Sequence, residues 1–216
     1  MERIIKIKES RFLQSLTTKV RNKETNSVDL QNLLFEIGRM IGAEIVGEEF
    51  TRIDNITTPM NDSFQGLSVT YKNIMIIGTR DDFEFFLKGL AGKFPNADIG
   101  YMDFNGQRGV ETYTAGIRSL VIPETPKGTL FDALIIAKSV LATGCTAVSL
   151  AKEALDQIMP SKLIIASCFY SERAIKEVHD QLPQAKLYLL GEPDKLNDDG
   201  MLVPGVGNID DRLKAS

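Results

Sequence analysis

The sequence lacks the patterns that mark several specialised classes of protein. It has no tryptophan and only two cysteines in 216 residues, too few for a disulfide framework. No apolar run approaches the ~20 residues that a membrane-spanning helix needs. The N-terminal residues mix charged and apolar side chains, without the apolar stretch of a signal peptide. We therefore expect a cytoplasmic protein that makes no contact with a membrane.

Concentrated positive charge is also missing. The chain has 25 Lys and Arg against 29 Asp and Glu, which gives a formal net charge of −4 at pH 7. Proteins that bind nucleic acid normally present a basic patch, and the basic residues here are scattered along the chain, apart from Lys19, Arg21 and Lys23, which we expect to form a solvated face. We therefore expect no nucleic-acid partner.

Metal-binding and nucleophilic patterns are scarce as well. The single histidine, His179, has no cysteine or histidine near it in the sequence. Asp194, Asp198 and Asp199 lie in an acidic loop that can bind Mg²⁺, although such loops are usually only solvated. Cys145 lies at the start of an expected helix, where a thiol pKa tends to fall, but no base is visible beside it. We predict no metal-binding residues and assign no catalytic residue.

What the sequence does contain is an alternation of strands and helices after a helical start. Apolar spacing predicts helices at 10–22 and 28–46. Further along, we expect a strand or hairpin at 67–78, a helix at 81–94 capped by Asp81 or Asp82, extended segments at 99–104 and 111–122 around an Asn105-Gly106 turn, strands at 132–137, 162–168 and 186–190, and helices at 146–158 and 171–182. This order predicts one α/β domain with a parallel sheet, whose ligands bind beyond the carboxyl ends of the strands.

Residues 132–150, DALIIAKSVLATGCTAVSL, carry the first functional signal. A buried strand leads through a loop of small residues into a helix, where unpaired N–H groups and the helix dipole can hold a phosphate. The loop lacks both a Walker Gly-Lys-Ser/Thr sequence and a Gly-x-Gly-x-x-Gly dinucleotide pattern. An ordinary strand-to-helix turn explains the loop equally well. The candidate phosphate-binding residues are Leu141, Ala142, Thr143, Gly144, Cys145 and Thr146.

The C-terminal segment carries the second signal. Residues 196–212 read LNDDGMLVPGVGNIDDR, and the two segments together resemble uracil phosphoribosyltransferases. In that family, Asp-Pro-Met-Leu-Ala-Thr-Gly-Gly binds the ribose and 5′-phosphate of phosphoribosyl diphosphate (PRPP). Val-Pro-Gly-Leu-Gly-Asp-Ala-Gly-Asp-Arg reads the uracil edge, largely with main-chain groups. Weaker matches lie at 33–45, 58–60 and 94–100.

The resemblance implies a parallel-sheet phosphoribosyltransferase-like α/β core with flanking helices. We expect a helical arm at 1–50, a core at 51–190 with a β-hairpin arm near 99–122, and a base-recognition tail at 191–216, in a homodimer or a higher homo-oligomer. The resemblance also implies the transfer of a phosphoribosyl group from PRPP to uracil or a related base, with Mg²⁺ brought by the diphosphate. Arg108, in the turn after the hairpin, can reach the diphosphate, although exposure to solvent is its more ordinary role. The candidate base-binding residues are Met201, Val203, Gly205, Gly207, Asn208 and Asp211.

Three positions depart from the family pattern. Lys138 stands where the family has an acidic residue that holds the ribose hydroxyls. Arg80, Asp81 and Asp82 replace the Arg-Ala-Gly turn that wraps the diphosphate, so we expect two carboxylates to face a polyanion. Ile209 replaces a small residue and is expected to add bulk beside the base. A non-catalytic nucleotide-binding, regulatory or scaffold protein therefore remains the alternative.

Overall fold

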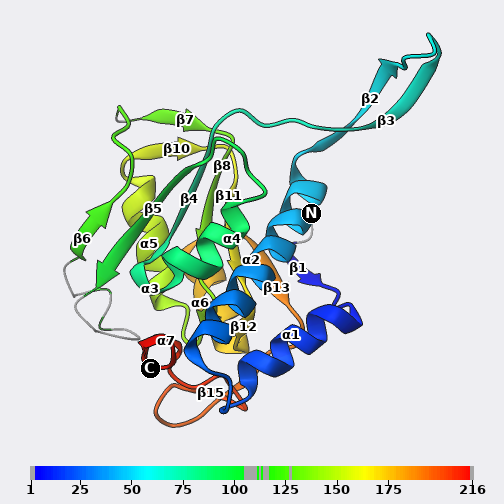
Figure 1. Ribbon diagram of the computed structural model, residues 1–216. Helices are drawn as coiled ribbons and strands as arrows, with labels where there is room; N and C mark the ends of the chain where they lie inside the picture. Colours follow the sequence, from blue (N-terminus) through cyan, green and yellow to red (C-terminus); the bar gives the residue numbers. More distant parts are fainter. Residues whose placement is uncertain (1–2, 105–110, 112, 114–116, 127, 215–216) are drawn as a thin grey trace.

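The computed structural model describes residues 3–104, 111, 113, 117–126 and 128–214. Its centre is a seven-stranded sheet in the order β1-β13-β11-β8-β4-β5-β6 (Figure 1). Neighbouring strands from β1 to β5 in this order are parallel, and β6 pairs antiparallel with β5. The strands are β1 (Ile4–Ile7), β4 (Ile74–Thr79), β5 (Asp98–Phe104), β6 (Ile117–Val121), β8 (Ala133–Ala137), β11 (Leu163–Ser167) and β13 (Lys186–Leu190). The expected α/β fold with a mainly parallel sheet is confirmed.

The central strands are buried on both faces, which explains their continuous apolar sequences. Every residue of β4 and of β8 is buried, as in parallel sheets that helices cover on both sides. Successive side chains point to opposite faces. Ile74 and Ile76 therefore join one hydrophobic cluster, and Met75 and Ile77 join the other.

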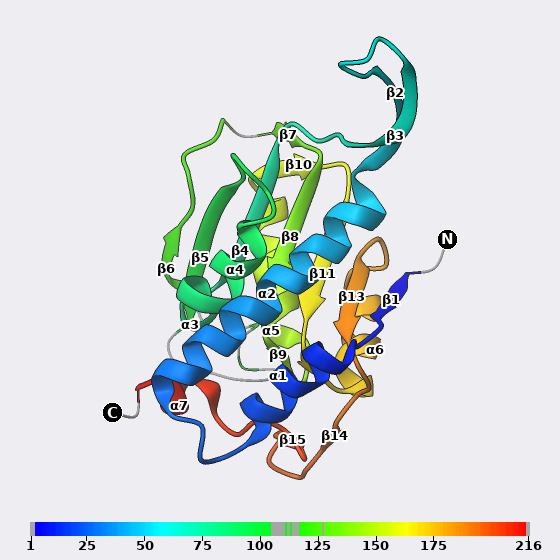
Figure 2. The same ribbon diagram turned by 45° about the vertical axis from the view of Figure 1, so that its right-hand side comes forward.

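Helices form a layer on each face of the sheet. One layer contains α1 (Arg11–Arg21), α2 (Ser27–Glu49) and the consecutive turns α3 (Arg80–Asp82), η1 (Phe83–Leu87) and α4 (Lys88–Ala91). Figure 2 shows α2 crossing this face of the sheet. The other layer contains α5 (Cys145–Leu155) and α6 (Glu172–Gln181). The helices expected at 10–22, 28–46, 146–158 and 171–182 are confirmed within a few residues at each end.

Local side chains explain where several helices begin. The side chains of Ser10, Asn26 and Ser171 each accept a hydrogen bond from the backbone N–H three residues further on. The helix expected at 81–94 begins at Arg80 instead, and neither Asp81 nor Asp82 caps it, because its N-cap is Thr79.

Two strand regions differ from the sequence prediction. The strand β1 was not expected; it adds to the sheet edge in parallel with β13. The extended region expected at 67–78 is two separate strands. Its first residues belong to an antiparallel hairpin of β2 (Thr51–Thr57) and β3 (Ser63–Val69) that projects away from the sheet (Figures 1 and 2).

The extended segments expected at 99–104 and 111–122 do contribute an antiparallel pair, β5 with β6, but β6 begins only at Ile117 and the pair belongs to the main sheet. Its Asn105-Gly106 turn and Arg108 fall outside the described residues.

Small two-stranded pairs complete the chain: β7 (Thr129–Phe131) with β10 (Ile158–Pro160), β9 (Val140–Leu141) with β12 (Phe169–Tyr170), and β14 (Lys195–Leu196) with β15 (Leu202–Val203). A short helix, α7 (Ile209–Lys214), follows. Among the described helices, none is both long enough and apolar enough to cross a bilayer.

Candidate functional site

The predicted site residues gather at the carboxyl ends of two neighbouring strands. β4 and β8 are parallel and in register, with Gly78 opposite Ala137. The Arg80 turn, which we define as residues 79–82, follows β4. The phosphate loop, which we define as residues 141–146, follows β8 and the short strand β9. The fold therefore brings both segments to one edge of the sheet, as expected from the sequence.

The phosphate loop has the geometry of an anion site. Gly144 adopts φ +86° immediately before α5, and a Cβ at this position would lie 2.9 Å from the backbone oxygen of Ala174. Glycine is therefore required both by the backbone conformation and by the close approach of α6. The first N–H groups of α5 have no acceptor within the helix, so they can donate to a ligand oxygen. Ser171 fixes the loop by donating from Oγ to the backbone oxygen of Ala142 at 2.6 Å.

Lys138 and Asp82 form a buried ion pair across this edge. Lys138 Nζ lies 2.6 Å from Asp82 Oδ2, and the two side chains are only 18% and 2% exposed. Asp82 also accepts hydrogen bonds from Thr79 Oγ1 at 2.9 Å and from the Ser139 backbone N–H at 3.2 Å. Asp82 therefore turns inward and joins the Arg80 turn to the end of β8. The expectation that its carboxylate faces a polyanion is wrong.

Asp81 and Arg80 occupy the outer part of the same turn. The Asp81 carboxyl group is joined by a hydrogen bond to Asp210 of α7. Local desolvation, and then the negative charge and hydrogen bond of Asp210, raise the pKa of Asp81 to about 6. Arg80 is 66% exposed, and its Nη1 lies 3.9 Å from Asp103 Oδ2. Arg80 is therefore accessible as a cation for an anionic ligand.

The predicted base-binding residues form a tight turn in the tail. Val203–Pro204 is a cis peptide, and Gly205 and Gly207 adopt φ +62° and +68°. A Cβ on Gly205 would lie 2.0 Å from the backbone oxygen of Leu202, so the turn excludes every larger residue there. Met201 N donates to Asn197 Oδ1 at 2.8 Å, and the Asn208 side chain donates to the Asp211 carboxylate.

Ile209 lies at the start of α7. Its side chain is 9% exposed and belongs to the hydrophobic cluster that also contains α1 and α2 side chains. Its side chain therefore packs into the core, and its place beside a base stays a prediction.

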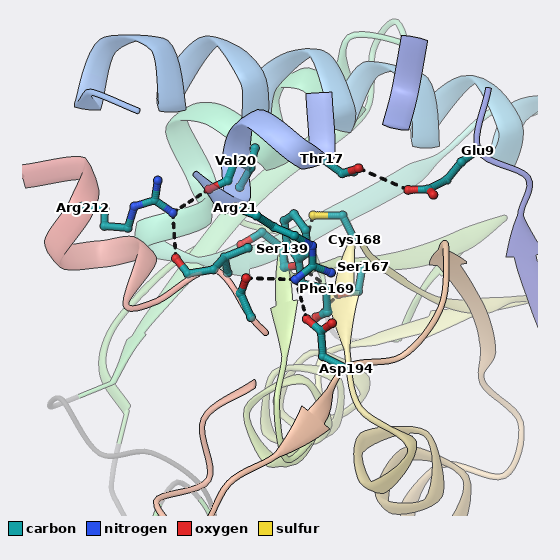
Figure 3. Close-up of polar contacts among 12 residues, drawn as sticks. Glu9, Thr17, Val20, Arg21, Ser139, Ser167, Cys168, Phe169, Asp194 and Arg212 are labelled. Carbon is teal, nitrogen blue, oxygen red and sulfur yellow. Dashed lines mark hydrogen bonds and ion pairs between the residues drawn. The ribbon is translucent and has the colours of Figure 1, made fainter. Parts of the chain in front are cut away.

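Two arginines tie this tail to the N-terminal arm (Figure 3). Arg21, the last residue of α1, donates from Nη1 to Asp194 Oδ2 at 2.7 Å and to the Gly205 backbone oxygen at 2.9 Å. Arg212 Nη1 donates to the backbone oxygens of Val20 and Val206, each at 2.7 Å. The two ends of the chain therefore meet at the candidate base-binding turn.

Asp194 and His179, which the sequence offered as candidates for metal binding or chemistry, lie outside the phosphate loop and the Arg80 turn. Asp194 is 9% exposed and paired with Arg21, so it is neither a solvated loop residue nor a free ligand for a metal. His179 lies within α6.

Tyr113 donates to Glu177 Oε1 at 2.5 Å and is also hydrogen-bonded to the Cys145 thiol, and burial together with these partners raises the pKa of Tyr113. A residue between β5 and β6 therefore reaches the start of α5.

Sequence reasoning missed Arg21, Asp194 and Tyr113 as residues around the site. Arg21 and Asp194 are 173 residues apart, and no spacing rule joins such positions. The sequence does contain a signal for Arg21. It ends a helix of strong apolar periodicity and belongs to a cluster of basic residues with Lys19 and Lys23, for which a solvated face is the expectation.

The donor atoms around the site do not suit a Mg²⁺ site formed by the protein. Mg²⁺ prefers carboxylate oxygens, whereas the end of β8 carries the Lys138 ammonium group. That ammonium engages Asp82, and Asp81 is engaged with Asp210. Across residues 3–104, 111, 113, 117–126 and 128–214, no three His, Cys, Asp or Glu side chains come close enough together to hold a metal ion.

Comparisons with known proteins point to one family. The family model described as "Uracil phosphoribosyltransferase" matches residues 7–214. A uracil phosphoribosyltransferase of Natronomonas pharaonis is 29% identical over 198 residues, which cover 90% of this chain and 89% of that protein. One from Pyrobaculum arsenaticum is 27% identical over 210 residues, covering 95% and 96%.

A solved structure has the same fold. The AQ2163 protein from Aquifex aeolicus superposes with a TM-score of 0.77 at 24% identity, covering 97% of each chain. The match of the family model over nearly the whole length, together with the arrangement of the phosphate loop and tail, shows that this chain belongs to the uracil phosphoribosyltransferase family.

Proposed function

We propose that this chain binds PRPP and uracil, or a closely related base, and transfers the phosphoribosyl group to give the nucleoside monophosphate and diphosphate. The observation that carries the proposal is the meeting of the phosphate loop, the Arg80 turn and the tail at one edge of the sheet. Relatives named uracil phosphoribosyltransferase support a phosphoribosyltransferase function.

Each ligand group has a proposed partner. The 5′-phosphate is assigned to the N–H groups and hydroxyls of Thr143, Gly144 and Thr146. The diphosphate is assigned to Arg80, and the base to main-chain groups of residues 201–208. Phosphoribosyl transfer passes through an oxocarbenium-like ribose, so the protein contributes positioning and electrostatic stabilisation rather than a covalent intermediate. We also propose that residues 1–216 act as a single unit, because the helical arm and the tail both contribute to the site.

A second candidate function is nucleoside monophosphate binding without turnover. Lys138 favours it, because an ammonium group only donates hydrogen bonds and cannot accept them from the ribose hydroxyls. The Asp82 carboxylate, which could accept them, is already engaged with Lys138, Thr79 and Ser139. Ribose contacts that an acidic side chain would supply are then lost, and turnover is expected to be weak.

Calorimetry with UMP and PRPP, paired with a turnover assay with uracil, PRPP and Mg²⁺, tests both candidates. Binding with turnover supports phosphoribosyl transfer. Binding of UMP with turnover near background supports the monophosphate-binding protein. If neither ligand binds to the native chain, both candidates are wrong.

The proposed place of the base has its own test. Gly205→Leu forces a side chain into the Leu202 backbone oxygen and should abolish UMP binding. Gly200→Ala is the matched control, because Gly200 also adopts a positive φ but a Cβ there would meet nothing within 4 Å. Undiminished UMP affinity of Gly205→Leu would place the base elsewhere.

We also propose that the chain forms a homodimer through the β2–β3 hairpin. Ile53 and Leu67 are paired across the hairpin and are 68% and 72% exposed, and Ile56 and Phe64 are paired and are 51% and 56% exposed. A two-stranded hairpin with exposed apolar pairs is marginal in water and needs a cover. Sedimentation analysis should show a dimer for the native chain and a monomer for Ile53→Lys combined with Leu67→Lys. A native monomer would rule this assembly out.

A further inference from the structure

The tail turn that carries the candidate base-binding groups, residues 203–207, is held from outside by the N-terminal helix. The carbonyl oxygens of Gly205 and Val206 are consecutive, and each accepts a hydrogen bond from a guanidinium group, the first from Arg21 and the second from Arg212. Both arginines bind at the end of α1, because Arg212 also donates to the backbone oxygens of Val20 and Asn22. The position of the turn is therefore set by α1.

Arg21 is fixed by an aromatic ring and a carboxylate as well as by the Gly205 carbonyl. Its guanidinium carbon lies 4.8 Å from the centre of the Phe169 ring, a stacking geometry that a planar cation favours. Its Nη1 binds Asp194, whose side chain is 7% exposed. Asp194 is itself held by its backbone N–H, which donates to the Tyr170 backbone oxygen at 2.8 Å. Figure 3 shows Arg21 between Phe169 and Asp194. The ring and the carboxylate thus hold the guanidinium group that supports the carbonyl of Gly205.

The chemistry of a main-chain recognition site explains why such a support matters. Backbone groups cannot change rotamer to meet a ligand, so their position must be set by the surrounding structure. A carbonyl that accepts a charge-assisted hydrogen bond is fixed in direction by that bond. The neighbouring main-chain groups of the same turn, which are the proposed partners of the base, are then fixed with it.

We infer that Arg21 is a positioning residue for the nucleobase, acting through Asp194 and the Gly205 carbonyl and without touching the base. The inference rests on the proposed function, since it assumes that residues 203–208 bind the base. It assigns to the helical arm a direct role in base affinity. Arg21 reaches the phosphate loop only through Phe169 of β12, which pairs with β9, so a smaller effect is expected there.

A cavity beside Arg21 provides a sharp way to test this. The cavity has a volume of about 670 Å³, and its lining includes Arg21, Phe169, Asp194 and Pro204 rather than the phosphate loop. Arg21→Ala should therefore leave a site into which a free guanidinium ion can enter and bind Asp194 again. Arg11→Ala is the matched control, because Arg11 is exposed at the other end of the same helix.

The experiment measures the affinities of UMP and of ribose 5-phosphate for the native chain, Arg21→Ala, Arg21→Lys and Arg11→Ala. We expect Arg21→Ala to weaken UMP about tenfold or more, as the loss of a charge-assisted hydrogen bond predicts. Ribose 5-phosphate affinity should change much less than UMP affinity. Millimolar guanidinium chloride, but not sodium chloride, should restore UMP affinity to Arg21→Ala, and Arg21→Lys should be intermediate.

Two outcomes would overturn the inference: unchanged UMP affinity in Arg21→Ala, or an equal loss of ribose 5-phosphate affinity, which would indicate general damage to the fold. Failure of the proposed function looks different, because the native chain would then bind no UMP. In that case amide hydrogen exchange of residues 205–208 still decides whether Arg21 holds the turn. Faster exchange in Arg21→Ala than in Arg11→Ala supports the positioning role, and equal exchange refutes it.

Discussion

Lys138 follows β8 and Asp82 lies in the turn after β4. Lys138 stands where the family pattern has an acidic residue, and Asp82 stands where it has a glycine. The structure shows that these two departures compensate each other in one buried ion pair. Lys138→Asp alone would leave two carboxylates together in a buried site, where both cannot remain ionised. We expect this variant to lose about 3 kcal/mol of unfolding free energy and to gain no turnover. Urea denaturation and the uracil assay measure the two effects.

A matched control separates burial from charge. Lys88→Asp removes the partner of Glu84 in an ion pair whose side chains are 41% and 57% exposed. It should cost less than about 1 kcal/mol, the usual value for a surface pair. The combined variant Lys138→Asp with Asp82→Gly should recover the stability that Lys138→Asp loses. A Lys138→Asp variant as stable as the native chain would show that the pair is not formed.

Among the elements, those with strong local patterns were predictable. The apolar run of β8 and the small-residue loop after it predicted both the strand and the start of α5. The short strand β1, in contrast, has only four residues among charged neighbours, and its pairing with β13 is decided by the sheet edge. Asp82 reaches Lys138 across 56 residues, so a sequence reading could not tell that its carboxylate turns inward rather than toward a ligand.

The packing of α2 against the segment that follows the Arg80 turn depends on glycine. A Cβ on Gly89 would lie 2.1 Å from the backbone oxygen of Phe35, so the two helical segments touch through their backbones. Gly89→Ala should force them apart and cost about 2 kcal/mol of unfolding free energy. Gly47→Ala in α2 is the control, because a Cβ there meets nothing within 4 Å and alanine favours the helix. Equal urea midpoints for the two variants would contradict this close contact.

The contact between α7 and the Arg80 turn should depend on pH. The pKa of Asp81 is raised to about 6 from 3.8, by desolvation and then by Asp210. Because this pKa is raised, the docked state takes up a proton as pH falls through about 6. Docking of α7 therefore strengthens as pH falls from 7 to 4, and weakens as pH rises from 4 to 7. Carbon-13 NMR of the Asp81 carboxyl group should give a midpoint near 6. Asp210→Asn should lower this midpoint and Asp211→Asn should leave it; a native midpoint near 4 would show that α7 is not docked on the turn.

At the scale of the whole molecule, the two ends of the chain meet at the candidate site. The helical arm supplies Arg21, the tail supplies the turn and Arg212, and the sheet supplies the phosphate loop and the Arg80 turn. The sequence alone does not connect the arm with the site, because the hydrogen bonds that join the arm to the tail are between residues 173 to 192 positions apart. The arm should therefore be treated as part of the site when variants are designed.

At the opposite end of the sheet, Glu49 joins α2 to the strands and should control the acid stability of the whole fold. Its carboxylate accepts hydrogen bonds from Lys162 at 2.8 Å, from Lys186 at 2.5 Å and from Tyr188 at 2.7 Å. Burial alone would raise its pKa, but these partners outweigh burial and lower the pKa of Glu49 to about 2 from 4.5. A lowered carboxyl pKa stabilises the fold above pH 4.5, and this stabilisation is lost as pH falls from 4.5 to 2.

Glu49→Gln should therefore cost about 2 kcal/mol at pH 7, and the difference from the native chain should shrink as pH falls toward 2. Urea denaturation at several pH values measures this difference directly. Glu48→Gln is the control, since Glu48 is an exposed neighbour on the same helix and should show no such trend. A Glu49→Gln deficit that stayed constant from pH 7 to pH 3 would mean that the lost stability comes from packing or neutral hydrogen bonds and not from the charge of Glu49.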